Sequence, residues 1–134
     1  MPRSQAVRDA NVIIYSWGIK DFNPIDVPFA YYSVNVTNLR DPIGQAHMVT
    51  AFEDGTAPTV VKWVKEDKRV PAILDTLQMI TEAHLRAGKE QYITLAFYDY
   101  HGKWISPALA ELTAERLDQL GYTVIVLHRS VKRA

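Results

Sequence analysis

The residues best suited to chemistry gather in one short segment near the centre of the C-terminal half. His101, Gly102, Lys103 and Ser106 bring together an imidazole, a residue without Cβ, a cation and a hydroxyl group. Glycine lets backbone N–H groups approach a ligand closely, and a helix N-terminus with a cation beside it attracts anions. These four residues therefore predict a small anion-binding site. The alternative is a helix cap below an exposed loop, which is the commoner meaning of such a pattern.

Aromatic side chains cluster in the same segment. Tyr98, Tyr100 and Trp104 lie within seven residues of one another, and Trp17 ends an apolar run elsewhere in the chain. Aromatic residues on a loop can stack on bases or anchor a protein partner. Packing over the edge of a sheet is an equally good interpretation. The sequence predicts a partner-binding surface made by these four residues.

A third group of candidates lies near the C-terminus. His128, Arg129, Lys132 and Arg133 could contact phosphate, although a solvated basic tail is the commoner meaning of such a run. The chain has no cysteine, which excludes thiolate metal sites and thiol nucleophiles. No paired carboxylates, Ser/His/Asp arrangement or metal-ligand spacing is recognisable. We therefore expect no metal and no cofactor, and a binding protein is favoured over an enzyme.

Composition narrows the classes of protein and partner. The chain has 134 residues, 48% of them hydrophobic, which suits one globular domain with a core. The formal net charge is zero, with 15 basic and 15 acidic residues. RNA binding would therefore need a local basic patch. No apolar run is long enough to cross a bilayer, and the first ten residues lack the apolar core of a signal peptide. We expect a cytoplasmic protein without membrane contact.

The C-terminal half shows the elements that position the candidate segment. A helix is predicted from Pro71 to Gly88, which would cap it. A buried strand follows at 92–97, then the candidate loop. The next helix is expected to take Ser106 as its cap and Pro107 as its first residue, and to end at Gly121. A further β-branched strand covers 122–127. A strand–helix–strand unit predicts a parallel pair with a right-handed crossover.

The N-terminal half is less regular. Residues 1–10 are expected to be flexible. An apolar strand at 12–15 leads into a turn at 16–18, and a weaker strand lies within 29–36. The stretch 45–69 is hardest to interpret, with a short helix at 59–65. Together these elements predict a single α/β domain over 11–130, with a small, mainly parallel sheet of about four strands flanked by helices, followed by a basic tail at 131–134. Ligands in such sheets bind beyond the carboxyl ends of the strands.

The order of these motifs resembles the C-terminal domain of the RapZ family, the RNase adapter proteins also called YvcJ-like. Members begin with a strand ending in Ser-Phe-Gly-Tyr-Lys, and they continue with Asp-Val-Arg-x-Leu-x-Asn-Pro and a Thr-Gly segment. They end with Gly-Tyr, a strand and His-Arg. The matching residues here are Ser16-Trp17-Gly18-Ile19-Lys20, Asn35 to Pro42, Asp54-Gly55-Thr56, Gly121-Tyr122 and His128-Arg129. The resemblance covers roughly residues 12–129.

The candidate loop departs from the family pattern. Family members carry Gly-Cys-Thr-Gly-Gly-x-His-Arg-Ser-Val there, a loop that suits an anion because it combines small residues with positive charge. Only Gly102 and Ser106 keep their positions in this chain. Tyr98, Asp99 and Tyr100 replace small residues of the family loop, and Trp104 and Ile105 stand where the family has His and Arg. The resemblance implies an amino-sugar phosphate ligand and small regulatory RNA as the family's partners. The family's ATPase domain has no counterpart, since no Walker pattern occurs.

These observations lead to a ranked set of functions. The first is a non-enzymatic binding or regulatory protein that engages a protein partner through the aromatic loop. A short, divergent, stand-alone chain would suit a phage or mobile element. The second is a small-molecule binding domain for a phosphorylated sugar or nucleotide, through Gly102, Lys103 and Ser106. The third is an RNA-binding adapter. Family members assemble through such domains, so a homo-oligomer is also open.

Overall fold

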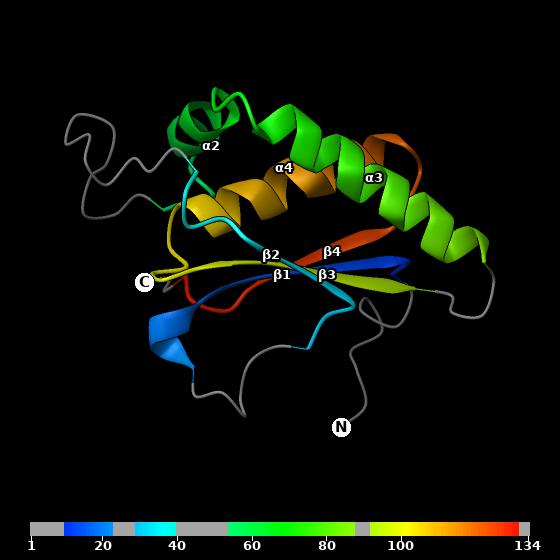
Figure 1. Ribbon diagram of the computed structural model, residues 1–134, viewed down its shortest axis with the longest axis horizontal. Helices are drawn as coiled ribbons and strands as arrows, with labels where there is room; N and C mark the ends of the chain where they lie inside the picture. The colour runs from blue at the N-terminus through cyan, green and yellow to red at the C-terminus, as the bar shows by residue number, and fades with distance from the viewer. Residues whose placement is uncertain (1–9, 23–28, 40–53, 88–91, 132–134) are drawn as a thin grey trace.

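The computed structural model describes residues 10–22, 29–39, 54–87 and 92–131 (Figure 1). Nearly all of the N-terminal segment predicted to be flexible and most of the predicted basic tail lie outside these ranges. Gly88, the expected helix cap, also lies outside them, as does the part of the stretch 45–69 up to residue 53.

The described strands form one parallel sheet, which confirms the predicted fold class. They are β1 (Val12–Gly18), β2 (Tyr32–Asn35), β3 (Ile93–Asp99) and β4 (Val124–His128). Their order across the sheet is β2-β3-β1-β4, and all three pairings are parallel. The apolar, β-branched runs of β1 and β3 occupy the two central positions, where both sides of a strand are hydrogen-bonded.

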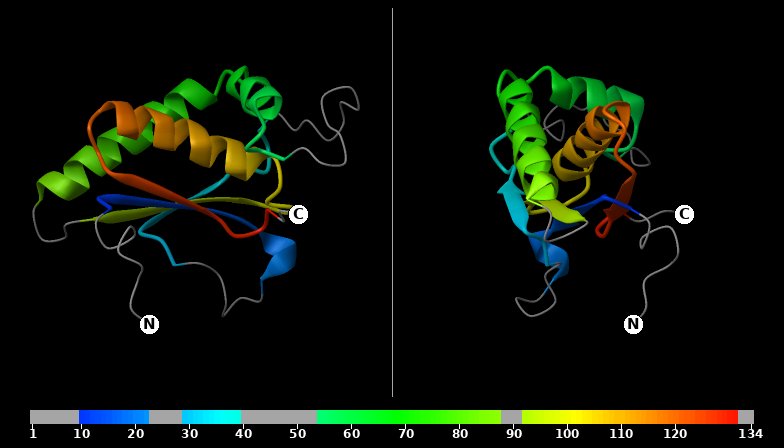
Figure 2. Two further views of the ribbon diagram at one scale, coloured as in Figure 1. Left: turned by 180° about the vertical axis from the view of Figure 1, so that it is seen from behind. Right: turned by 90° about the vertical axis from the view of Figure 1, so that its right-hand side faces the viewer.

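Three α-helices in the described part of the chain lie on the same face of this sheet (Figure 2). They are α2 (Pro58–Lys65), α3 (Val70–Arg86) and α4 (Ile105–Gln119). A short 3-10 helix, η1 (Ile19–Asp21), follows β1. The short helix predicted at 59–65 is confirmed, and so is the proline in the first turn of α3.

The core lies between the sheet and the helices. Alternate residues of the central strands, such as Ile14 and Phe97, are fully buried and join one hydrophobic cluster with Leu109 of α4. Helix α4 contacts β1, β3 and β4 as well as α2 and α3. Each fully buried apolar side chain of this kind stabilises the fold by about 1.5–3 kcal/mol. Burial around α4 therefore fixes where the loop before it begins.

Two local predictions are wrong. Strand β1 does not turn at Ser16 but continues to Gly18, because it pairs with β3 along its whole length. Helix α4 begins at Ile105 with Trp104 in the N-cap position, and no side chain caps it. Ser106 lies inside the first turn and is fully buried, with its hydroxyl directed to Asp99 instead.

Within the described ranges, no helix is both long and apolar enough to cross a membrane. The same residues contain no group of three or more His, Asp or Glu side chains placed to hold a metal ion.

Candidate functional site

The carboxyl edge of the sheet brings the predicted segments together. Strands β1 and β3 end side by side, with Gly18 opposite Asp99 in the register. The loop after β3 therefore lies next to the η1 segment after β1. The Lys20 N–H donates a hydrogen bond to the Tyr100 carbonyl across 3.1 Å. The loop and the segment that follows β1 thus meet at this edge.

The two segments touch through glycines. A Cβ atom added to Gly102 would lie 2.3 Å from the Gly18 nitrogen, and one added to Gly18 would lie 2.3 Å from the His101 carbonyl oxygen. Gly102 also has a φ of +66°, a region that other residues rarely adopt. Backbone meets backbone here, which leaves no space between the two segments for a side chain.

Asp99 accepts hydrogen bonds from residues near the start of α4. Its side chain is buried, and its Oδ1 accepts a hydrogen bond from the Gly102 N–H at 2.5 Å. The Ser106 hydroxyl donates to the same oxygen at 3.4 Å. Backbone N–H groups near a helix N-terminus are the donors that usually bind a phosphate or sulfate. In this chain a carboxylate of the protein itself accepts from two of the predicted anion-binding residues.

A third segment covers the start of α4. The Gly55 N–H donates to the Lys103 carbonyl at 2.7 Å, and a Cβ on Gly55 would lie 2.1 Å from the Trp104 carbonyl oxygen. Next to it, Asp54 Oδ1 accepts from the Thr56 N–H at 2.7 Å and from the Thr56 hydroxyl at 2.5 Å. The Asp54-Gly55-Thr56 turn therefore packs directly against the candidate loop.

The four aromatic residues differ in exposure. Trp17 is buried and stacks on Tyr98, with ring centroids 4.8 Å apart and an interplanar angle of 18°. Trp104 is half-buried, and its indole nitrogen is buried without a hydrogen-bond partner among the described residues. Tyr100 alone of the four is strongly exposed, at 55%. Trp17 and Tyr98 thus pack against each other, whereas Tyr100 faces solvent.

The other two predicted anion-binding residues contact aromatic rings. The His101 ring lies edge-on to Tyr100 at 5.0 Å and to Trp104 at 5.6 Å. The Lys103 ammonium lies 4.9 Å from the centre of the Trp104 ring, a cation–π distance. His101, Lys103 and Trp104 therefore form a contact group of their own on the loop.

A chain of three polar side chains, which runs from the buried Ser16 to the partly exposed Glu111, was not predicted from the sequence. The Ser16 hydroxyl lies 2.6 Å from His128 Nδ1, and His128 Nε2 lies 2.7 Å from Glu111 Oε1. One ring nitrogen of His128 thus contacts a hydroxyl and the other a carboxylate, and the tautomer of the ring sets which group donates in each contact. Ser16 is fully buried, whereas the Glu111 side chain is 39% exposed. A serine nucleophile must be open to its substrate, so this arrangement ties strands and helix together and does not suit acyl transfer.

The predicted phosphate contacts at the C-terminus are separated from one another. His128 is engaged by Ser16 and Glu111, while Arg129 is exposed. The Arg129 N–H donates to the Ser16 carbonyl at 2.8 Å, which places it beside the end of β1. Lys132 and Arg133 lie outside the described residues.

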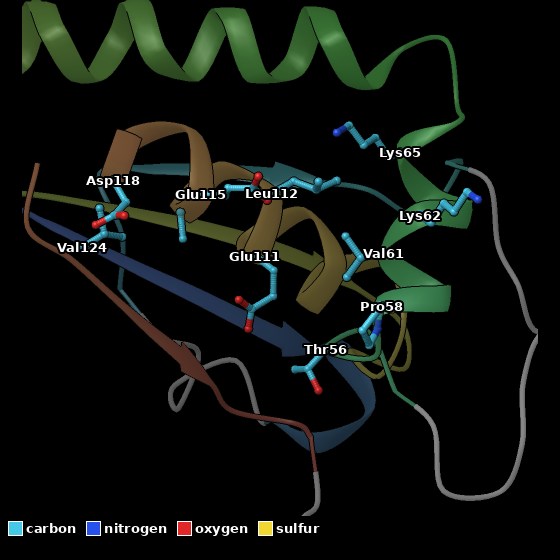
Figure 3. Close-up of a pocket in the computed structure, with 11 residues that line it drawn as sticks. Thr56, Pro58, Val61, Lys62, Lys65, Glu111, Leu112, Glu115, Asp118 and Val124 are labelled. Atoms are coloured by element: carbon cyan, nitrogen blue, oxygen red, sulfur yellow. The ribbon is translucent and has the colours of Figure 1, made fainter. Parts of the chain in front are cut away.

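A groove of about 630 Å³ runs between α2 and α4 (Figure 3). Lys62 and Lys65 on α2 form one wall, and the acidic residues of α4, including Glu115, form the other. Apolar residues such as Leu112 lie between them. Glu111 also lines this groove, so the buried Ser16–His128 pair reaches it through that carboxylate. No pattern in the sequence singled out these charges, because they come from separate helices.

Comparisons with known proteins agree on one family. The family model described as RapZ C-terminal domain matches residues 10–132. A nucleotide-binding protein of Trichlorobacter lovleyi is 31% identical over 96% of this chain and 45% of its own length. A nucleotide-binding protein of Mycolicibacterium vanbaalenii is 32% identical over 96% of this chain and 40% of its own. One of Geobacillus thermodenitrificans is 31% identical over 91% and 40%. The chain therefore spans less than half the length of these relatives.

Proposed function

Because the chain belongs to the RapZ C-terminal domain family, we propose that it is a non-enzymatic binding and regulatory protein that acts through a protein partner. In this proposal the family's anion loop is closed by the chain's own Asp99, and the exposed Tyr100 beside it provides the contact. The relatives' names describe binding rather than a chemical reaction. These names support a binding role in general, and the support for a protein partner comes from the residues of this chain.

The observation that carries the proposal is the hydrogen bonding of Asp99. Its Oδ1 accepts from the Gly102 N–H and the Ser106 hydroxyl. A phosphate at the same place would have to displace a buried carboxylate and would meet its negative charge at close range. Repulsion between two anions that share donors costs far more inside a protein than in water. The loop is therefore better suited to holding its own shape than to holding a free anion.

Tyr100 provides an exposed contact surface on the closed loop. Its side chain is exposed, and its backbone carbonyl accepts a hydrogen bond from Lys20 in η1, directly after β1. Tyrosine offers a large apolar area at a low cost in conformational entropy, and it is enriched among the residues that dominate binding energy. An exposed tyrosine on a hydrogen-bonded backbone therefore suits an anchor for a protein partner.

Photo-crosslinking tests this function at a single position. A benzoylphenylalanine at position 100 should form a discrete crosslinked product with a protein from the source cell, and Tyr100→Ser should weaken binding of that purified protein at least tenfold. The matched control places the same crosslinker at Leu120, which is 49% exposed at the far end of α4. Equal crosslinking from both positions, or unchanged affinity after Tyr100→Ser, would contradict the proposal.

The competing function is recognition of a phosphorylated sugar or nucleotide. It is favoured by the relatives' description as nucleotide-binding proteins. If Asp99 closes the loop, inorganic phosphate, glucose 6-phosphate and AMP should leave the melting temperature of the natural chain unchanged. Asp99→Gly should destabilise the fold by about 1–3 kcal/mol, since buried donors lose their acceptor, and phosphate should restore part of that loss.

Asp99→Asn is the matched control for this screen. The amide oxygen can still accept from Gly102, but the negative charge is gone. Stabilisation of the natural chain by a phosphorylated compound, by about 2.7 kcal/mol at a hundred times its dissociation constant, would support the competing function and contradict closure by Asp99. RNA binding stands third, because it would need a local basic patch. Among the described residues of the basic segment predicted at the C-terminus, Arg129 is the exposed cation.

A further inference from the structure

Strand β2 leaves one side of its backbone without a partner strand. It lies at the edge of the sheet and pairs only with β3 among the described strands. The Val36 N–H, immediately after β2, donates to the Tyr98 carbonyl of β3 at 2.9 Å, as the register of the two strands requires. Successive residues of a strand direct their N–H and C=O groups to opposite sides. In the register of β2 on β3, the backbone groups of Ser33 and Asn35 therefore point away from β3, toward the free edge.

This edge lacks the usual protection against strand pairing. Edge strands are normally blocked by charged side chains, prolines or bulges. Residues 32–35 are Tyr-Ser-Val-Asn, with neither a charge nor a proline, and they pair with β3 in an unbroken register. Another extended chain could therefore add to β2 without burying an unpaired charge.

An apolar groove of about 550 Å³ runs between this edge strand and α3. Ile73, Leu77 and Ile80 line it from the helix, and Tyr32 and Val34 line it from the strand. No residue that lines it carries a formal charge. The groove lies on the helix-covered face of the sheet, so a strand added to β2 would direct every second side chain into it.

Exposed hydrophobic side chains concentrate around the same groove. Seven large hydrophobic residues are exposed in the described part of the chain, and three of them lie in or beside the segment that leads into β2. Phe29 is 76% exposed, and Tyr31 and Tyr32 are each 40% exposed. Such a concentration marks an interaction surface more often than a scattered set does.

We propose that the groove between β2 and α3 binds an extended segment of a partner protein, which adds to β2 as a further strand. The free backbone groups of Ser33 and Asn35 select an extended chain, since only another strand can pair with both. The uncharged lining selects apolar side chains at alternate positions. This surface is separate from the Tyr100 loop, and its occupant does not depend on the function proposed above.

A peptide selection on the full chain tests this proposal. A displayed library of random twelve-residue peptides is selected on the immobilised protein, and the best peptide is then measured by calorimetry. We expect alternating apolar residues in the selected sequences. Thr76→Arg and Ala72→Arg, two exposed positions on the groove side of α3, should each weaken binding at least tenfold. Hydrogen exchange of the Ser33 and Asn35 amides should slow when the peptide is bound.

Controls separate this surface from the others. Leu120→Arg adds the same charge at an exposed hydrophobic position outside the groove, and it should leave the peptide's affinity unchanged, as should Tyr100→Ser. The circular dichroism melting curve of each variant checks its fold. Failure to select any peptide, or binding that leaves the β2 amides unprotected, would overturn the proposal. So would a dimer of the natural chain that Thr76→Arg dissociates, because a second copy would then be the occupant.

Discussion

A carboxylate that accepts hydrogen bonds from a backbone N–H and a hydroxyl competes with any other anion for the same donors. Asp99 does this at the start of α4, at a loop position where the RapZ pattern carries cysteine. The change of one residue thus supplies an acceptor inside the protein. The neighbouring Tyr100 and Trp104 add bulk and ring contacts to the loop. The chemistry of the loop depends on these individual side chains more than on the shape of its backbone.

The buried Ser16–His128 contact should show as a coupling between two substitutions. His128→Leu leaves the fully buried Ser16 hydroxyl without its partner, which should cost about 1–3 kcal/mol of unfolding free energy beyond lost packing. Ser16→Ala removes the hydroxyl as well. The double variant should therefore be more stable than the sum of the single losses by about 0.5–3 kcal/mol. Urea denaturation of the four proteins measures this coupling.

Arg129→Ala provides the reference for this cycle. Arg129 follows His128 directly but has an exposed side chain, so its substitution should add to Ser16→Ala within about 0.5 kcal/mol. If His128→Leu and Ser16→Ala also proved additive, the hydrogen bond between them would contribute no measurable coupling.

At the scale of elements, the sequence predicted most of the fold because strands and helices carry local signals. The β-branched run at Val12–Tyr15 and the proline near the start of α3 are both readable without a structure. The extension of β1 to Gly18 was missed, since it depends on pairing with β3 along the chain from residue 93. Propensity describes one segment at a time, whereas pairing decides where a strand ends.

The candidate site was less predictable for the same reason. Ser106 before Pro107 is a strong capping pattern, yet Asp99 accepts the serine hydroxyl and the helix begins one residue earlier. The Ser16–His128 pair joins positions 112 residues apart. It depends on β1 lying next to β4, a sheet order that the succession of elements does not reveal. Given that order, the register of Ser16 opposite His128 would have identified the pair.

On the scale of the whole molecule, α4 connects the functional regions. Its first turn carries Ser106 beside Asp99, its middle supplies Glu111 to the groove and to His128, and its buried face packs on three strands. Its contact with α3 includes an ion pair between Arg116 and Asp75 near the surface. The position of this one helix therefore determines the geometry of the loop, the groove and the polar chain together.

Burial, rather than the surface ion pair, should hold α4 in place. Leu109 is fully buried in the core cluster, so Leu109→Ala should reduce the free energy of unfolding by about 2–5 kcal/mol. Arg116→Ala breaks an ion pair in which the Asp75 side chain is 72% exposed, and it should cost no more than about 1 kcal/mol. Urea denaturation followed by tryptophan fluorescence and by far-ultraviolet circular dichroism measures both, and the two signals should coincide because the sheet and helices share one core. A larger loss from Arg116→Ala than from Leu109→Ala would show instead that the contact between α3 and α4 governs stability.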